Sequence, residues 1–350
     1  MNASPRTLVV RLGRAGDVLL AGPALRAAAA GSPAVTLLCG PQGEAAGRLL
    51  PGVDDLIVYD APWVSLSPPP LRREDVAALV ERLAAGRFDR ALIFTSFHQS
   101  PLPAALLLKM AGVPWTGADS EDYPGSLLQL RHRRAPHRHE AAAALELTEA
   151  AGFSLPPGDD GALRARPPPD PAHLPGAAPY VVLPPGAAVP ARTWSPARSE
   201  RAAAALAAAG HRVVVTGSPG EEALTRRVAG HHALDLGGRT TPPELAGGLA
   251  RAKVVIAGNT GPAHLAAAVR TPIVSLFSPV VSADRWLPYR VPHLRLGRQD
   301  TACAGTRARL CPVAGHPCLD SITDDEVLSA VAALTVGGSR RDRAGRKAPA

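Results

Sequence analysis

The most informative segment of this chain is Thr7-Leu-Val-Val-Arg-Leu-Gly-Arg-Ala-Gly-Asp-Val-Leu-Leu20. A short apolar run at 8–12 passes through the turn 13–17 into a helix that we expect to continue to about Ala30. The same succession of strand, turn and helix recurs along the chain. Alternating strands and helices are typical of parallel sheets covered by helices, so the sequence predicts an α/β fold.

The alternating units form two series, which fits the length of 350 residues. The proline-rich stretch 156–179 separates them and cannot form a sheet ladder or a helix interior. We therefore predict two Rossmann-like domains with parallel sheets facing a central cleft, at 1–155 and 180–336, followed by a disordered basic tail at 337–350. Ligands of such sheets bind at the carboxyl ends of the strands.

Individual elements follow from apolar runs and from helix start and stop signals. In the first half we expect strands at 35–39, 56–59 and 91–95, helices at 75–85, 103–111 and 140–151, and an irregular segment at 116–139. In the second half we expect strands at 180–183, 213–216, 254–257 and 273–277, and helices at 196–209, 262–269 and 324–334. Ser218 with Glu221, and Thr241 with Glu244, match the capping box.

Composition and charge exclude several classes of protein. No apolar run approaches the length of a membrane span, and Arg11 and Asp17 interrupt the segment where a signal peptide needs an apolar core, so we expect a cytoplasmic protein. Half of the net charge of +8 falls in the last eleven residues, and aromatic residues make up only 4%. We therefore predict no nucleic-acid partner. A second basic cluster, 131–138, is interpreted as a solvated loop, and contact with an anionic acceptor is left open.

The four cysteines indicate reduced thiols. Cys39 ends an apolar run and is predicted to be a core residue. Cys303, Cys311 and Cys318 are spaced eight and seven residues apart, unlike the paired spacing of zinc sites. A local disulfide or an adventitious metal is the alternative that this spacing leaves open.

The opening turn carries a carboxylate, Asp17, between the first strand and the first helix. Its glycines are Gly13 and Gly16 alone, so the G-x-G-x-x-G fingerprint of dinucleotide-binding folds is incomplete. From position alone the leading interpretation is that Asp17 caps the helix and complements its dipole. The alternative is a functional carboxylate at the edge where ligands bind.

A second turn, Asn259-Thr-Gly-Pro-Ala-His264, follows an apolar strand and opens a helix. Backbone amides at a helix start bind phosphate, and Gly261 lets the backbone approach closely. His264 could reach the same anion or a sugar. An ordinary helix start with a half-buried histidine explains the pattern equally well.

Two further segments carry polar groups after strands. Gly186 forms a turn after the strand at 180–183, and Arg192 precedes the helix start at Trp194-Ser-Pro, which suits a diphosphate but also describes a loop arginine. Glu221 has a capping role, whereas Glu222 has none, and a carboxylate after a strand can bind ribose hydroxyls. The sequence alone does not separate these two glutamates.

Taken in order, these segments resemble glycosyltransferase family 9, the heptosyltransferases that extend the inner core of lipopolysaccharide. The similarity rests on R-x4-G-D-V-L-L-x-x-P-A-L-R from Arg11, the P-G-A turn before W-x-P, the G-x-x-x-E-E segment and N-T-G-P-x-H-L-A-A-A from Asn259. It extends from about Leu8 to Val331 and includes the late segment Cys318-Leu-Asp-Ser-Ile322. It implies a GT-B fold, with the acceptor on the first domain and the nucleotide-sugar on the second.

The resemblance also implies roles for individual residues. Asp17 matches the general base, Arg192 the diphosphate contact, and Glu222 or Glu221 the ribose contact. The implied donor-binding set is Gly186, Arg192, Glu221, Glu222, Asn259, Thr260, Gly261 and His264, and the acceptor-side set is Arg11, Gly16 and Ser100. Asn259 stands where the family often has Asp, and Ser278 where it often has Gly, which puts the choice of donor in question.

The function expected from this resemblance is an inverting, metal-independent glycosyltransferase. It would use no cofactor and an ADP-linked sugar, with heptose as the family default and a glycan or glycolipid as acceptor. The chain contains no Asp-x-Asp triplet of the kind that binds metal in other glycosyltransferases. A nucleotide-sugar epimerase and a non-catalytic nucleotide-sugar-binding protein are the alternatives. We expect a monomer, and leave transient contact with the inner face of the membrane open.

Overall fold

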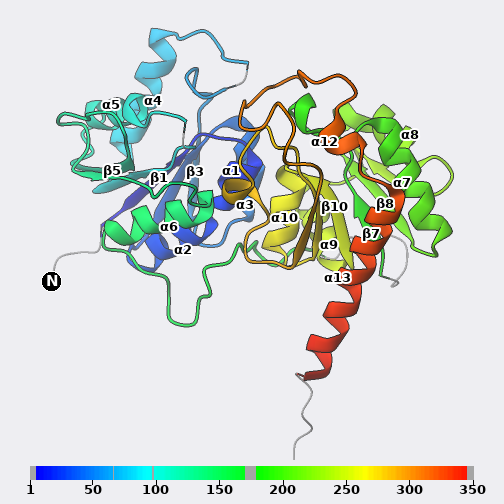
Figure 1. The fold of residues 1–350 in the computed structure, drawn as a ribbon. Coiled ribbons are helices and arrows are strands. Elements are labelled where there is room, and N and C mark those ends of the chain that lie inside the picture. The colour runs from blue at the N-terminus through cyan, green and yellow to red at the C-terminus, as the bar shows by residue number, and fades with distance from the viewer. Residues whose placement is uncertain (1–4, 66, 97, 170–178, 345–350) are drawn as a thin grey trace, which may run out of the picture. The chain divides into compact units, whose positions relative to one another are not determined.

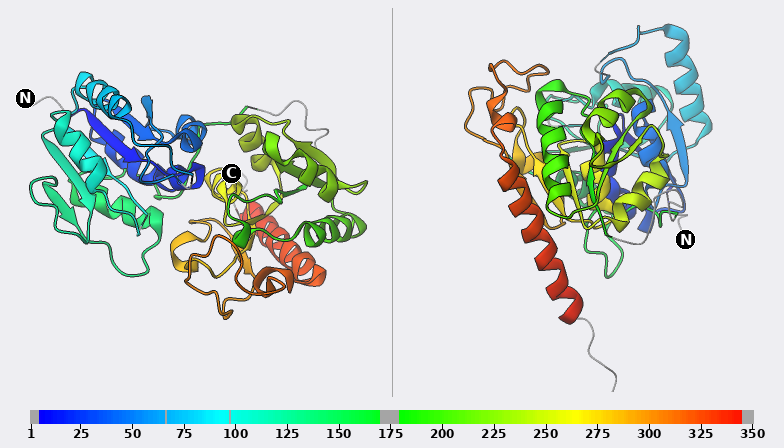
Figure 2. Two further views of the ribbon diagram at one scale, coloured as in Figure 1. Left: turned by 90° about the horizontal axis from the view of Figure 1, so that it is seen from above. Right: turned by 90° about the vertical axis from the view of Figure 1, so that its right-hand side faces the viewer.

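A computed structural model describes the backbone of residues 5–65, 67–96, 98–169 and 179–344, and side chains as far as residue 335. The chain divides into two compact units, Met1–Arg166 and Pro167–Ala350. Each unit is built on one six-stranded sheet, and every neighbouring pair of strands is parallel (Figures 1 and 2). The predicted α/β class with two parallel sheets is confirmed.

The first unit has the strand order β3-β2-β1-β4-β5-β6, that of the Rossmann fold. Its elements are β1 (Thr7–Arg11), α1 (Ala15–Leu20), α2 (Gly22–Ala30), β2 (Val35–Cys39), α3 (Pro41–Leu49), β3 (Asp55–Val58), α4 (Arg73–Ala85), β4 (Arg90–Ile93), α5 (Leu102–Met110), β5 (Trp115–Asp119), β6 (Leu130–His132) and α6 (Glu140–Ala150). Leu8 and Val10 pack in one cluster with residues of α4 and α5. Val9 is also buried and, because side chains alternate along a strand, points to the other face.

The second unit repeats this topology, with the order β9-β8-β7-β10-β11-β12. Its elements are β7 (Val181–Leu183), η1 (Pro190–Arg192), α7 (Pro196–Ala208), β8 (Val213–Gly217), η2 (Pro219–Glu221), α8 (Glu222–Ala229), β9 (Leu234–Gly237), α9 (Pro242–Arg251), β10 (Val254–Gly258), α10 (Gly261–Ala268), β11 (Ile273–Leu276), α11 (Ala283–Trp286), β12 (His293–Leu296), α12 (Pro317–Asp320) and α13 (Asp324–Ala344). Val181, Val254 and Val274, from three adjacent strands, share one buried core cluster.

Several elements depart from the sequence-based expectations. The segment 116–139, expected to be irregular, contains most of β5 and all of β6. The sequence also did not predict α3, β9 and β12. The expected single first helix breaks at Ala21, because Pro23 has no N–H with which to continue the ladder of α1. The capping boxes of Ser218 with Glu221 and of Thr241 with Glu244 are both present.

The boundary between the units falls inside the predicted linker. Asp159 accepts hydrogen bonds of 2.7 and 2.9 Å from Arg26, and the Arg166 amide donates to the Leu49 carbonyl at 2.7 Å. Leu163 is fully buried. Residues 159–166 are therefore held on the first unit, and part of the remaining predicted linker, 170–178, lies outside the described residues.

The chain end also differs from its expectation. Helix α13 continues to Ala344, where we expected a disordered tail from 337. Arg is the most frequent residue type in this stretch and has high helix propensity. Residues 345–350 of the predicted tail lie outside the described residues.

The Arg26–Asp159 ion pair should contribute measurably to the stability of the first unit. Its side chains are only 8% and 5% exposed, so Asp159→Ala leaves a buried guanidinium and is expected to cost about 3 kcal/mol of unfolding free energy. The neighbouring variant Asp160→Ala, whose side chain is 51% exposed, should cost less than about 1 kcal/mol. Urea denaturation of both variants measures the difference, and equal costs would contradict it.

The same ion pair has a defined pH dependence. Hydrogen bonds from Arg26 hold the pKa of Asp159 below its ordinary value of 3.8. A depressed pKa in the folded state means that the contribution is complete above about pH 5 and is lost as the pH falls through the unfolded and then the lower folded value. The stability difference between wild type and Asp159→Ala should therefore be constant above about pH 5 and shrink below about pH 4.

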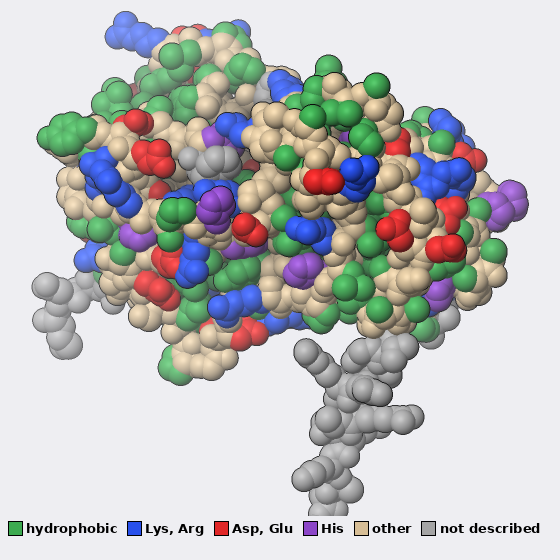
Figure 3. Space-filling view, in the orientation of Figure 1, with side chains coloured by type: hydrophobic (Ala, Val, Ile, Leu, Met, Phe, Trp, Pro, Cys, Tyr) green, Lys and Arg blue, Asp and Glu red, His purple; other side chains and the backbone are tan. Residues whose placement is uncertain are grey.

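Two further observations concern membrane spanning and surface charge. Among the described residues, the helices lack the combination of length and apolar character needed to cross a bilayer. On the face visible in Figure 3, Lys and Arg side chains are interspersed with Asp and Glu side chains.

Candidate functional site

The first unit has a small polar pocket at the carboxyl ends of β1 and β4. These are the strands where the sheet order reverses, the usual ligand position in such folds. The pocket is lined by Arg11, Asp17, Leu20, Ala21, Phe94, Thr95, Arg134, Glu140 and Ala144. The structure thus brings the predicted residues Arg11 and Asp17 together at one site.

Asp17 lies in the first turn of α1 and has two roles available. Its Oδ2 accepts a hydrogen bond of 2.9 Å from the Arg14 amide, which is the predicted capping role. Its Oδ1 accepts from Arg11 Nη2 at 3.2 Å, and its side chain is 21% exposed. Each carboxylate oxygen has two lone pairs, so both keep acceptor capacity. The carboxylate lies directly over Gly13, where a Cβ would come within 2.4 Å of Oδ2.

Arg11 connects Asp17 to a second carboxylate. Its side chain is only 5% exposed, and its Nη2 lies 3.2 Å from Asp17 Oδ1 and 3.7 Å from Glu140 Oε2. The same nitrogen donates to Ser96 Oγ at 3.4 Å, and Nε donates to the Asp17 carbonyl at 3.2 Å. One buried guanidinium is therefore shared between two acidic side chains.

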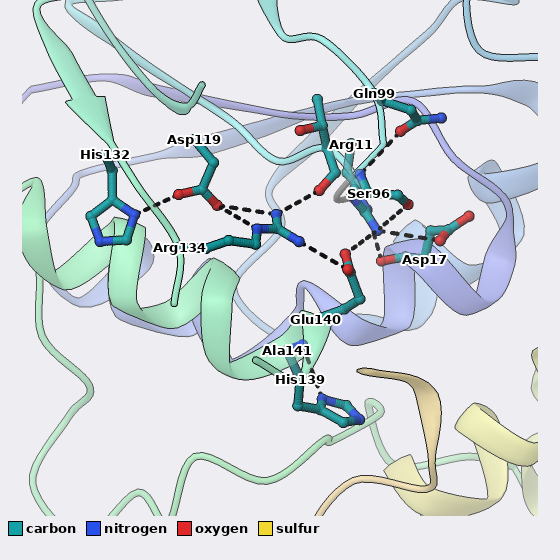
Figure 4. Close-up of polar contacts among 11 residues, drawn as sticks. Arg11, Asp17, Ser96, Gln99, Asp119, His132, Arg134, His139, Glu140 and Ala141 are labelled. Carbon is teal, nitrogen blue, oxygen red and sulfur yellow. Dashed lines mark hydrogen bonds and ion pairs between the residues drawn. The ribbon is translucent and has the colours of Figure 1, made fainter. Parts of the chain in front are cut away.

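The charged cluster continues away from Asp17 (Figure 4). Glu140 Oε1 accepts from Arg134 at 2.9 Å, Arg134 also binds Asp119 at 3.1 Å, and Asp119 lies 2.5 Å from His132 Nδ1. Sequence reasoning missed Glu140, Arg134, Asp119 and His132 as members of a site. The only signal was the basic cluster 131–138, which we interpreted as a solvated loop.

The other predicted acceptor-side residues lie in different surroundings. Gly16 is partly buried in α1, beside Asp17. Ser100 is exposed just before α5, where its hydroxyl bonds to Asp122 at 3.3 Å and does not join the Arg11 cluster.

The second unit has its own pocket at the corresponding place, the carboxyl ends of β7 and β10. It is lined by Leu183, Pro184, Pro185, Gly186, Ala187, Arg192, Trp194, Ser199, Gly258 and Leu276. The predicted residues Gly186 and Arg192 therefore share one pocket. Gly258 accommodates the Arg192 backbone, because a Cβ there would come 3.0 Å from the Arg192 carbonyl.

The η1 segment that carries Arg192 is hydrogen-bonded to residues of the segment 309–319, more than a hundred positions later in the sequence. The Ala191 amide donates to the Arg309 carbonyl at 3.0 Å, and His316 Nε2 lies 3.3 Å from the Ala191 carbonyl. Trp194 Nε1 donates to the Leu319 carbonyl at 3.1 Å. The position of Arg192 thus depends on the segment 309–319.

The two candidate ribose contacts lie in different places. Glu221 Oε2 accepts from the Ser218 amide and hydroxyl at 2.8 Å, and its other oxygen lies against Gly186, where a Cβ would come within 1.7 Å of it. Glu222 is exposed and lies near Gly238, at the end of β9. Glu221 is therefore committed to capping, and Glu222 has the more available carboxylate.

The start of α10 lies directly after β10. No described side chain caps this helix, and Thr260, its N-cap residue, bonds weakly to the Gly258 carbonyl at 3.4 Å. The Nδ2 atom of Asn259 is buried with no hydrogen-bond partner among the described residues. His264 is 3% exposed, so it is more buried than the half-buried histidine we considered.

The cysteines carry free thiols, and Cys39, Cys303 and Cys318 are buried. Cys318 Sγ lies 3.8 Å from the hydroxyl of Ser278. Among the described residues no group of three or more His, Cys, Asp or Glu side chains is arranged to hold a metal ion.

Comparison with known proteins gives one family match. Residues 76–315 match the model of glycosyltransferase family 9 (heptosyltransferase). This range contains every predicted donor-side residue and begins after Asp17. A stretch of 104 residues is 36% identical to lipopolysaccharide heptosyltransferase 3 of Escherichia coli, covering 28% of this chain and 31% of that relative, so the chain matches less than a third of its length.

Solved structures share the fold over nearly the whole chain. A glycosyltransferase family 9 protein from Veillonella parvula superposes with a TM-score of 0.78 at 19% identity, covering 96% of this chain and 99% of that one. The E. coli heptosyltransferase WaaC, solved with ADP-2-deoxy-2-fluoro heptose, gives a TM-score of 0.67 at 20% identity, covering 94% and 99%.

Proposed function

The chain belongs to glycosyltransferase family 9 and has the GT-B fold, and from this premise we propose that it transfers a sugar from a nucleoside diphosphate to a hydroxyl group of a glycan or glycolipid. The proposal includes inversion at the anomeric carbon, no required metal, and an ADP-linked heptose as the first donor to test. The observation that carries it is the pair of pockets, each at the point of strand-order reversal, one lined by Asp17 and the other by Arg192.

In this proposal Asp17 is the general base. An acceptor hydroxyl is a weak nucleophile, and a positioned carboxylate that takes its proton during attack contributes about 10²–10⁴ in rate. Asp17 is suited to this because its carboxylate is partly exposed, keeps acceptor capacity on both oxygens and is held in place by Arg11 and by the Arg14 amide.

On the donor side, the second unit would stabilise the leaving diphosphate. The bond from the anomeric carbon to the diphosphate oxygen breaks, and negative charge grows on the leaving group. Arg192 and the uncapped start of α10 supply positive charge and amide dipoles near that pocket. The unpaired Asn259 Nδ2 adds a donor where a carboxylate would repel the diphosphate, and exposed Glu222 is the proposed ribose contact.

Family membership favours transfer over the epimerase alternative. A non-catalytic binding protein would keep the second pocket and have no use for the base. Substitution of Asp17, treated in the Discussion, separates these two cases.

The donor class can be tested by thermal denaturation with nucleotides. A nucleoside diphosphate at about 100 times its dissociation constant should stabilise the protein by ~2.7 kcal/mol, which corresponds to several degrees in Tm. We expect ADP to raise the Tm more than AMP, which lacks the second phosphate that Arg192 and α10 would bind. Equal shifts with ADP and AMP would contradict the diphosphate site, and a larger shift with UDP or GDP would reject the adenine assignment.

A further inference from the structure

The charged cluster of Figure 4 contains a buried carboxylate, Glu140, that the proposed mechanism does not use. Its side chain is only 2% exposed, and it lies at the first position of α6, where the helix dipole favours a negative charge. A buried carboxylate is retained only with compensating partners. The partners of Glu140 include Arg134 at 2.9 Å and Arg11 at 3.7 Å.

Arg11 and Arg134 lie among three carboxylates, namely Asp17, Glu140 and Asp119, and His132 lies beside Asp119. Arg11 therefore interacts with two acidic groups at once. If Arg11 paired with Asp17 alone, the carboxylate would be stabilised in its charged form and would be a poorer proton acceptor.

We propose that Glu140 is a positioning residue that sets the basicity of Asp17 by sharing Arg11 with it. Asp119 extends the same arrangement by one step, because it shares Arg134 with Glu140. The inference rests on the proposed role of Asp17 as base, but the electrostatic coupling itself can be measured without turnover.

The first test measures the coupling directly in the full-length protein. Carbon-13 labelling of Asp carboxyl groups, with the Asp17 signal identified by its absence in Asp17→Asn, follows the titration of this group by NMR. Removing the Glu140 charge in Glu140→Gln should move the midpoint of this titration to lower pH, because Arg11 would then interact with Asp17 alone. An unchanged midpoint would overturn the proposal.

The second test measures the consequence for the reaction, as ADP release from ADP-heptose with a heptose-free lipopolysaccharide as acceptor. Glu140→Gln should lower kcat by about three- to tenfold and leave the KM for the donor within about twofold, because proton-transfer rates follow basicity. In an Asp17→Asn background the same substitution should have no further effect. Additive losses in the double variant would contradict action through Asp17.

Controls separate positioning from folding and from the proposed function. Asp159→Asn neutralises another buried, arginine-paired carboxylate of the first unit, and should lower stability without moving the Asp17 titration. If Glu140→Gln does not fold, Asp119→Asn should shift the titration in the same direction by less, and no shift would again refute the coupling. A shifted titration together with full activity of Asp17→Asn would refute the base role while leaving the coupling intact.

Discussion

Asp17→Asn is expected to abolish most of the transfer activity while leaving donor binding intact. The amide cannot take a proton from the acceptor hydroxyl, so kcat should fall by at least about tenfold and by as much as about 10²–10⁴. The proposed donor pocket lies in the other unit, at the ends of β7 and β10, and has no residue in common with the pocket around Asp17. The shift in Tm produced by ADP should therefore be that of the wild type.

The matched control is Asp160→Asn, which neutralises an exposed carboxylate of the same unit that lies outside the Asp17 pocket. It should transfer sugar at the wild-type rate. Single-turnover measurement of both variants, with Tm as the check on folding, gives the comparison. Wild-type turnover by Asp17→Asn would remove this residue from the mechanism and favour the non-catalytic alternative.

Arg192→Gln is expected to have the second large effect. Its cation lines the pocket at the ends of β7 and β10, where the diphosphate would gain charge as the glycosidic bond breaks. Loss of one such preorganised donor typically costs about 10²–10³ in kcat. Because the diphosphate is charged in the ground state as well, the stabilisation by ADP should also decrease.

Arg201→Gln is the charge-matched control, since Arg201 is exposed on α7, the helix that follows the Arg192 segment. It should leave both kcat and the ADP-dependent Tm shift unchanged. Equal effects of the two variants would indicate a general loss of positive charge and would argue against a specific diphosphate contact at Arg192.

The sequence predicted the parts of this fold that depend on local pattern. Apolar runs located β1, β2 and β10, which are almost wholly buried, and the capping box at Ser218 appeared where its spacing indicated. Of the residues that the motifs suggested for the donor side, Gly186 and Arg192 line one pocket at the carboxyl end of β7.

The charged cluster of the first unit could not be predicted in the same way. Asp119, His132 and Glu140 are brought together by β5, β6 and α6, and β6 is a three-residue strand with no buried residue. Such a strand has no apolar alternation to reveal it. Its contacts join residues that are distant in sequence, so the charges at 131–138 resembled an ordinary solvated loop until their partners were known.

The hydrogen bonds between the Arg192 segment and residues 309–319 have a consequence for protein engineering. Consider a chimera with a relative, made to alter donor preference, that exchanges only the stretch around 186–196. The segment that carries the new arginine would then contact residues 309–319 of this chain, to which it is not matched. The incoming segment would have to match the Arg309 and Leu319 carbonyls and the His316 ring that hold the present one. A chimera that exchanges 186–196 and 309–319 together preserves these bonds. The junctions between the two parent sequences should therefore lie outside 186–320.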